Sequence, residues 1–298
     1  MKIAVVGSIN MDMTVKTERI PLAGETVKGE DLCYIPGGKG ANQAAAMAKL
    51  GADVEMFGCV GEDEAGAKLL KDLEETGVGT KWIRKSRGVP TGLAMITAGE
   101  GDNTIVVVAG ANDSVTPEYI DSVRENLLEA DIVILQHEIP AETNKYVIRL
   151  FYENHKKIVL NPGPARPVSQ EIIDKITYLT PNEHEAAIIF GTELSTEELL
   201  RKYPEKLLIT MGSKGVAIRL LSGGTLLVPA RPAKVVDTTG AGDTLNGAFT
   251  VQIAEGRSVE EALTFANVAA SLSTEKFGTR AGMPTYKEVL DEIERTRK

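Results

Sequence analysis

The pattern of apolar and polar residues predicts short strands at the start of the chain. Residues 1–7 form an apolar run typical of a buried first strand, and residues 12–17 alternate polar with apolar, as a half-exposed strand does. Segments 25–28 and 32–35 are further short strand candidates, because glycines and prolines separate them. The beginning of the chain is therefore rich in strands.

Helical spacing first appears at residues 40–50, and Gly51 ends it. A strand at 54–61 and an amphipathic helix at 64–76, ended by Gly77, then form the first strand–helix unit. This order is typical of a parallel sheet whose connections are helices.

A second strand-rich patch follows, because residues 91–98 and 104–109 flank a predicted hairpin turn at 99–103. From Pro117 onward helices alternate with continuous apolar strands, which predicts a mostly parallel sheet covered by helices. The strands of this half are predicted at 132–135, 158–161, 178–180, 207–210 and 216–220, with a further strand ending at 234–236.

The two strand-rich patches, 11–36 and 91–109, interrupt an α/β core formed by residues 1–10, 37–90 and 110–298. We expect both patches to build one small sheet that stands off the core as a lid. The alternative is two ordinary surface hairpins.

Composition narrows the class of protein. The 298 residues are 43% hydrophobic, enough for a sizeable core, and the formal net charge is -9. A protein that binds nucleic acid or a membrane surface usually needs basic patches, so neither partner is expected. Only two cysteines occur and no Cys-x-x-Cys spacing, so no zinc or redox pair is indicated. No membrane span and no signal peptide are expected, and we expect a cytoplasmic protein.

Segment 237–243, Asp-Thr-Thr-Gly-Ala-Gly-Asp, carries the strongest candidate chemistry. Its glycines open a predicted helix that ends before Gly256, and backbone N–H groups at a helix start can bind an anion. A carboxylate there, Asp243, suits a base that takes a proton from a hydroxyl beside a transferring phosphoryl group. The alternative is a capping Asp after a tight turn. Neither a Walker A loop nor a dinucleotide fingerprint is present.

Upstream, Gly37-Gly38-Lys39-Gly40-Ala41-Asn42-Gln43 also opens a helix, and its glycines allow close approach of a ligand. Asn42 is a poor helix-interior residue and favours a capping or ligand role. Asn10 and Asp12 follow the first strand, at the edge where open α/β sheets bind ligands, and their groups suit sugar hydroxyls. The alternatives are a glycine-rich turn at a helix start for residues 37–43, and turn chemistry for Asn10 and Asp12.

Two further loops are weaker candidates. Thr180-Pro181-Asn182-Glu183-His184-Glu185 opens a helix, where its polar groups can hold Mg²⁺ through water or simply cap the helix. Thr210-Met211-Gly212-Ser213-Lys214-Gly215 joins two apolar strands as a hairpin or as a loop that contacts a nucleotide. The three histidines lack the spacing of metal ligands.

Taken together, these motifs resemble the ribokinase branch of the phosphofructokinase-B carbohydrate-kinase family. The resemblance covers essentially the whole chain, and segments 37–43 and 237–243 match the two signatures of the family in order. Gly24-Glu25-Thr26 also falls where the family has a similar segment. The resemblance implies a Rossmann-like, mostly parallel sheet sandwiched by helices, a small β-sheet lid, and a homodimer joined through the lids. It also implies transfer of a phosphoryl group from ATP to D-ribose.

The resemblance also implies a role for each matching residue. Asp243 would be the catalytic base, and Gly240, Ala241 and Gly242 would form the anion hole. The sugar would contact Asn10, Asp12, Gly38, Lys39, Asn42, Glu138 and Asp243. Mg²⁺ and the phosphates would lie near Asn182 and Glu185, and the nucleotide would be bound by Thr210, Gly212, Ser213, Gly215, Gly242 and Asn267.

Activation by a monovalent cation, K⁺, is a further implication of the resemblance. The matching positions are Asp237, Thr239, Ser273, Lys276, Gly278 and Gly282, several of them acting through backbone carbonyls. Lys276 can contribute only its carbonyl, since an ammonium group cannot bind a cation.

Other functions stay open on the sequence alone. A kinase of the same family for fructose, deoxyribose, adenosine or a phosphorylated sugar is the nearest alternative. A phosphosugar would need extra basic residues in the lid, and a nucleoside would need aromatic stacking. A non-catalytic sugar-binding regulator would be expected to lose the base or the glycines of the anion hole, yet both are intact. A nicotinamide dehydrogenase lacks its fingerprint.

Overall fold

A six-stranded parallel sheet forms the centre of the molecule, in the order β10-β9-β8-β1-β4-β5. The structure is a computed structural model and describes residues 1–100, 102–191 and 194–296. The strands of this sheet are β1 (Lys2–Val6), β4 (Asp53–Gly61), β5 (Gly79–Ser86), β8 (Ile132–Gln136), β9 (Lys157–Asn161) and β10 (Tyr178–Leu179). The predicted α/β architecture is confirmed.

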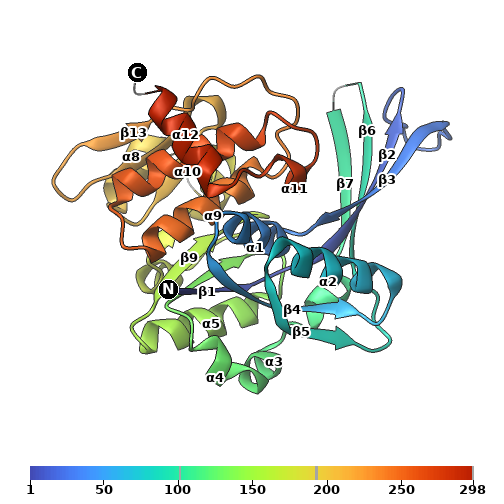
Figure 1. Cartoon of the computed structure of the whole chain (residues 1–298), viewed down its shortest axis with the longest axis horizontal. Helices are drawn as coiled ribbons and strands as arrows, with labels where there is room; N and C mark the ends of the chain where they lie inside the picture. Colours follow the sequence, from blue (N-terminus) through green and yellow to red (C-terminus); the bar gives the residue numbers. More distant parts are fainter. Residues whose placement is uncertain (101, 192–193, 297–298) are drawn as a thin grey trace.

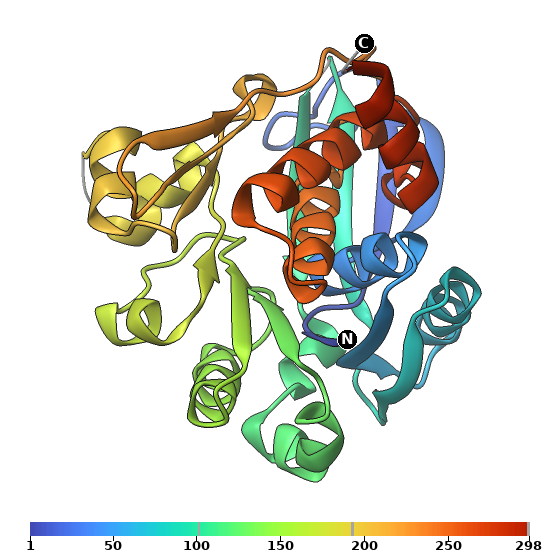
Figure 2. The same ribbon diagram turned by 60° about the vertical axis from the view of Figure 1, so that its left-hand side comes forward.

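Helices cover both faces of this sheet, as Figures 1 and 2 show. Alternate residues of β1 face opposite ways: Ile3 and Val5 join one buried cluster, while Ala4 and Val6 join the other. The first cluster includes α1 (Lys39–Lys49), α2 (Glu64–Thr76), α9 (Ala241–Ala254), α10 (Val259–Ser273) and α12 (Tyr286–Thr296). The second includes α3 (Pro117–Ser122), α4 (Arg124–Leu127), α5 (Ala141–Glu153), α6 (Gln170–Lys175), α7 (Glu183–Phe190) and α8 (Thr196–Lys202).

Both strand-rich patches contribute to one four-stranded sheet, which we call the lid sheet, in the order β3-β2-β6-β7. Its strands are β2 (Asn10–Thr17), β3 (Gly29–Gly37), β6 (Gly92–Gly99) and β7 (Asp102–Val108). Strand β2 pairs with β3 antiparallel and with β6 parallel, so the two patches are joined by backbone hydrogen bonds. Figure 1 shows this sheet projecting from one side of the core.

Three strands form a third sheet, which departs from the expected parallel arrangement. β11 (Leu208–Thr210), β12 (Val216–Arg219) and β13 (Thr225–Val228) pair antiparallel. The turn between β11 and β12 contains a short 3-10 helix, Gly212–Lys214, so this segment is a hairpin. Figure 1 shows this sheet on the opposite side of the core from the lid sheet.

Two other strand predictions are wrong. Residues 25–28 are irregular, because Glu25 accepts from the Leu22 N–H and pairs with Arg19, which closes a turn. Residues 234–236 are irregular and exposed, although the Val236 N–H donates to the Thr274 carbonyl. Strands β5 and β13 were not predicted because their sequences mix polar and apolar residues. In the described part of the chain, no helix has both the length and the apolar character to cross a membrane.

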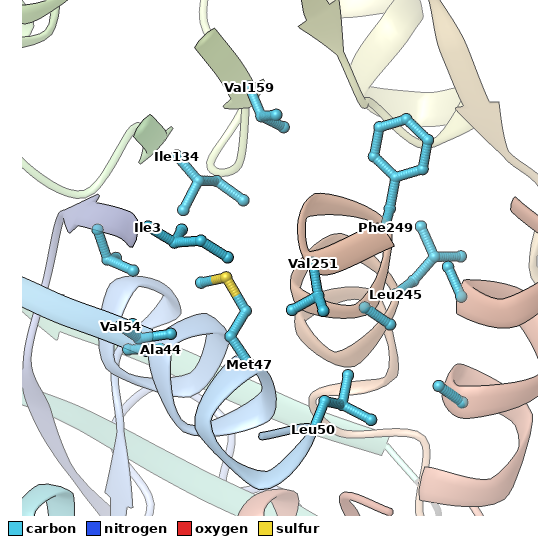
Figure 3. Close-up of a cluster of buried hydrophobic side chains, with 14 of the residues drawn as sticks. Ile3, Ala44, Met47, Leu50, Val54, Ile134, Val159, Leu245, Phe249 and Val251 are labelled. Atoms are coloured by element: carbon cyan, nitrogen blue, oxygen red, sulfur yellow. The ribbon is translucent and has the colours of Figure 1, made fainter. Parts of the chain in front are cut away.

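Helices α1 and α9 pack against each other over β1 and β8, and this contact places the two glycine-rich segments. Figure 3 shows Met47 of α1 facing Val251 of α9. A Cβ on Gly247 of α9 would lie 2.9 Å from the Ala46 Cβ, closer than side-chain carbons approach. The helices are therefore in contact at Gly247.

We expect Gly247→Ala to lower the free energy of unfolding by about 1–3 kcal/mol, the usual cost of overpacking a core. Chemical denaturation measures this value. Gly242→Ala is the matched control, because a Cβ at Gly242 meets no atom within 4 Å. If Gly247→Ala were as stable as Gly242→Ala, the close contact between α1 and α9 would be disproved.

Candidate active site

The two signature segments meet at the start of α9. Asp243 lies in the first turn of α9, and the residue is 7% exposed. One oxygen accepts from the Asn42 Nδ2 at 3.2 Å and the other from the Gln43 Nε2 at 3.0 Å. These amides come from the first turn of α1, so the packing of α1 on α9 fixes the carboxylate.

An anion-binding surface lies beside this carboxylate, at the N-terminus of α9. Gly240 is the N-cap with φ 76°, a left-handed conformation that favours glycine. The Ala241 N–H donates to the Thr238 carbonyl, and the Thr244 N–H donates to the Gly240 carbonyl. In the described part of the chain, no protein oxygen accepts from the N–H groups of Gly242 or Asp243. They are available to bind an anion, with the helix dipole in support. Of the N–H groups predicted for the anion hole, that of Gly242 is therefore available, whereas that of Ala241 is engaged by Thr238.

Residues predicted to bind sugar gather on the other side of Asp243. Gly38 has φ 86°, and a Cβ there would lie 2.7 Å from the Asn10 backbone nitrogen, so strand β2 and the start of α1 are in contact. Glu138 accepts from the Lys39 N–H at 2.9 Å and from the Ser8 hydroxyl. The Asn10 Oδ1 accepts from the Asn112 Nδ2 at 2.6 Å. Amide and carboxylate groups of this kind suit a polyhydroxyl ligand.

Lys39 connects the sugar side with the opposite side of the site. The Lys39 Nζ and the Glu185 Oε1 both lie close to Gly163. A Cβ built on Gly163 would lie 3.1 Å from the Nζ and 2.9 Å from the Oε1. The charge of Asp243 raises the pKa of Lys39 most, although burial opposes this shift, and Glu138 and Glu185 raise it further. The ammonium group therefore stays charged among carboxylates.

Asp12 has the most displaced pKa of the carboxyl groups at this site. Burial raises its pKa to about 7, and the charges of Glu138 and Asp243 raise it as well, while Arg280 lowers it. The Arg280 side chain was not predicted to lie at the site. Burial lowers the pKa of Arg280 to about 10, so the guanidinium remains charged at neutral pH.

A buried network of amides supports Asp243, and most of its members were also not predicted. Gln43 donates to Asn161 Oδ1 at 3.1 Å and accepts from Gln136 Nε2 at 2.6 Å. The Thr180 hydroxyl donates to the Asn246 Oδ1, and the Asn246 Nδ2 donates to the Gly242 carbonyl at 2.8 Å. Gln136 and Asn161 are the last residues of β8 and β9. Their position as polar residues at the carboxyl ends of parallel strands was the feature of the sequence that could have indicated a place at the site.

The predicted nucleotide residues form a continuous path away from Asp243. Asn182 caps α7 and exchanges hydrogen bonds with Glu185, so the capping interpretation holds for this pair. Asn182 also pairs with Thr210, which joins α7 to the β11–β12 hairpin. In that hairpin Ser213 is exposed, and Gly212 and Gly215 have φ of 55° and 100°.

Asn267 lies beyond the hairpin and lines a cavity of about 450 Å³ between β13 and α10. Its Nδ2 donates to the carbonyls of Val228 and Pro229 at 3.1 Å and 2.6 Å. A Cβ on Gly215 would collide with the same Val228 carbonyl, which connects the cavity to the hairpin.

Five of the six predicted cation residues are brought together near the start of α9. Asp237 accepts from the N–H groups of Thr239 and Gly278 at 2.9 Å and 3.0 Å. Gly282, in α11 (Thr279–Gly282), approaches the Ser273 carbonyl so closely that a Cβ would lie 2.2 Å from it. The side chain of the sixth, Lys276, faces outward, 3.9 Å from Glu288, which leaves only the predicted carbonyl for the cation.

Comparison with known proteins identifies the family of this chain. The chain matches the model of the pfkB family carbohydrate kinase over residues 1–286. It is 50% identical over 288 residues to the ribokinase of Bacillus subtilis, covering 96% of this chain and 97% of that protein. It is 46% identical over 300 residues to the ribokinase of Lactococcus lactis, covering 98% of each.

A solved structure gives the same result. The structure of Arabidopsis thaliana ribokinase complexed with ribose and ATP matches with a TM-score of 0.88 at 35% identity, over 98% of both chains. The chain therefore belongs to the pfkB family of carbohydrate kinases. It is an ATP-dependent sugar kinase.

The pKa of Asp12 predicts a pH dependence. In the sugar-binding role predicted for Asp12, its charged form would accept hydrogen bonds from sugar hydroxyls, and this form is lost as the pH falls through about 7. We expect kcat/KM for the sugar to fall below about pH 7. Glu138→Gln removes a charge that raises this pKa, so it should move the fall to lower pH. Profiles of kcat/KM for the wild type, Glu138→Gln and Asp12→Asn test this. If kcat/KM of Asp12→Asn still falls near pH 7, the fall is caused by the titration of another group.

Proposed function

We propose that this protein transfers the γ-phosphoryl group of ATP to the terminal 5-hydroxyl of D-ribose, giving ribose 5-phosphate and ADP. The observation that carries the proposal is the Asp243 carboxylate, held by Asn42 and Gln43 beside the free N–H groups of Gly242 and Asp243. A base and an anion-binding surface on the same helical turn suit phosphoryl transfer to a hydroxyl. The likeness to ribokinases, one of them complexed with ribose and ATP, supports ribose as the sugar.

In the proposed reaction Asp243 accepts the proton of the attacking hydroxyl. The N–H groups of Gly242 and Asp243 and the positive end of α9 stabilise the charge on the transferring group. Lys39, located between Asp243 and Glu185, adds a positive charge on the path between sugar and phosphates. Closure of the lid sheet over the sugar would exclude water, the competing nucleophile.

Mg²⁺ fits the oxygen-rich start of α7. Glu185 uses Oε2 in the helix cap, which leaves Oε1 toward Lys39 and Gly163. Glu185 and Asn182 would therefore hold the ion through water, and the ion would neutralise phosphate charge. We further propose that K⁺ binds among Asp237, Thr239, Ser273, the Lys276 carbonyl, Gly278 and Gly282. Carbonyl groups and one carboxylate are suitable ligands for a large monovalent cation.

A release assay for ADP tests the proposal. We expect ribose to give the highest kcat/KM among ribose, deoxyribose, fructose, fructose phosphate and adenosine, and K⁺ to exceed Na⁺ as activator. Asp243→Asn should keep sugar binding and lower turnover by roughly 10²–10⁴, the range for loss of a general base. A higher kcat/KM for any other acceptor would refute ribose, and near-normal turnover of Asp243→Asn would refute the base.

We also propose that the enzyme is cytoplasmic and that it forms a homodimer. The two subunits would be joined through their lid sheets. Strand β7 is an edge strand, and all seven of its residues are exposed. Four of them are consecutive apolar residues, and Val106 is 62% exposed. Unprotected edge strands with apolar side chains favour pairing with another chain. A second copy of the same sheet is a self-complementary partner.

Val107→Lys places a charge in this surface and should convert the dimer to a monomer at micromolar concentration. Light scattering after size-exclusion chromatography measures the mass. Tyr152→Lys, on the exposed face of α5, is the matched control and should stay dimeric. A wild-type protein that is monomeric in this measurement would end the proposal.

A further inference from the structure

Arg280 is a buried cation that no part of the proposed reaction uses. It lies in α11, is 9% exposed, and extends toward α1, α2 and the lid sheet. Its Nη1 pairs with Asp72 of α2, and its Nε lies 3.5 Å from the Asn42 Oδ1. The guanidinium is thus held on two sides by residues of the core.

One group of this guanidinium has no partner. The Nη2 atom is buried, and in the described part of the chain no protein atom accepts a hydrogen bond from it. Buried donors are nearly always satisfied, because leaving one unpaired in the interior is costly. A charged donor makes that cost larger. The free group at this position therefore indicates an acceptor that arrives from outside the protein.

The direction of the acceptor follows from the neighbouring charges. Arg280 and Asp12 act on each other electrostatically, but no direct hydrogen bond joins them. Asp12 lies on β2 of the lid sheet and Asn42 on α1, and both are among the residues proposed to bind sugar. The Nη2 group is therefore located at the junction between the lid sheet and the core, on the sugar side of Asp243.

We propose that Arg280 is a further substrate-binding residue, whose Nη2 donates to a ribose hydroxyl that itself donates to Asp12. A hydroxyl can donate and accept at once, so it satisfies both the carboxylate and the guanidinium. This arrangement would also link the lid sheet to α11 through the sugar. The inference rests on the proposed function, since it takes ribose as the ligand.

A cycle of enzyme and substrate changes tests it. Arg280→Gln is measured with ribose and with ribose lacking its 1-, 2- or 3-hydroxyl, each as kcat/KM with saturating ATP. With ribose we expect a loss of about 10- to 100-fold, typical of a hydrogen bond to a charged donor. With the one analogue that lacks the bound hydroxyl, the kcat/KM of Arg280→Gln should differ from that of the wild type by less than about twofold.

The cycle separates this role from a structural one. Arg280 also contacts Asn42, so a loss that is equal for ribose and all three analogues would mean that it acts only through Asn42 and Asp243, and would overturn the inference. Arg231→Gln is the matched control, since the Arg231 side chain is 9% exposed and also pairs with carboxylates, those of Glu275 and Glu292. Arg231→Gln should lower Tm, but its ratio of kcat/KM for ribose to kcat/KM for each analogue should equal that of the wild type.

Failure of the proposed function would look different. If the wild type phosphorylates ribose and Arg280→Gln does so with unchanged kcat/KM, only the role of Arg280 is refuted. If the wild type does not phosphorylate ribose at all, the proposed function fails first and the inference fails with it.

Discussion

The site depends on how closely α1 and α9 approach each other. Gly247 lets the helices touch, and this contact brings Asn42 and Gln43, near the start of one helix, to the carboxylate near the start of the other. A wider separation would leave Asp243 without its two amide partners. The catalytic geometry is therefore set by apolar packing below the site, which Figure 3 shows, rather than by the polar residues alone.

The amide network extends this constraint to the sheet. Gln136 and Asn161 end neighbouring parallel strands, so their side chains meet at one edge and both reach Gln43. Because amides both donate and accept, the network holds a buried carboxylate in a fixed orientation and places no additional charge beside it. Asn246 closes the network onto the backbone of Gly242, so the Asp243 carboxylate and the first turn of α9 are positioned together.

The sequence predicted the parallel core and the lid sheet, because both depend on local periodicity and on the position of glycines. The helix at 64–76 was predicted with its bounds, since Gly77 ends it in a left-handed conformation. The strand at 25–28 was wrong because Glu25 satisfies a turn through its side chain, which alternation of residues cannot reveal. The antiparallel pairing of β11 with β12 was one of the two alternatives for residues 210–215, whereas β13 was not predicted because its sequence mixes polar and apolar residues.

Much of the candidate site followed from glycine-rich helix starts, as at Gly38 and Gly240. The contacts between side chains that are distant in the sequence could not be predicted. Gln43 is an ordinary helical residue until Asp243 and Asn161 lie beside it, and Arg280 has no local feature that places it near Asn42 and Asp12. Such residues are recognisable only when the fold has brought them together.

The charges around the sugar position have a consequence for the later part of the catalytic cycle. Three carboxylates, those of Asp12, Glu138 and Asp243, surround this position with two cations, Lys39 and Arg280. An uncharged sugar enters this environment without electrostatic penalty. The phosphorylated product would carry new negative charge between these carboxylates and the anion-binding start of α9. The carboxylates would repel that charge, while Lys39 and the helix start would attract it, so release of the product depends on the balance between the two.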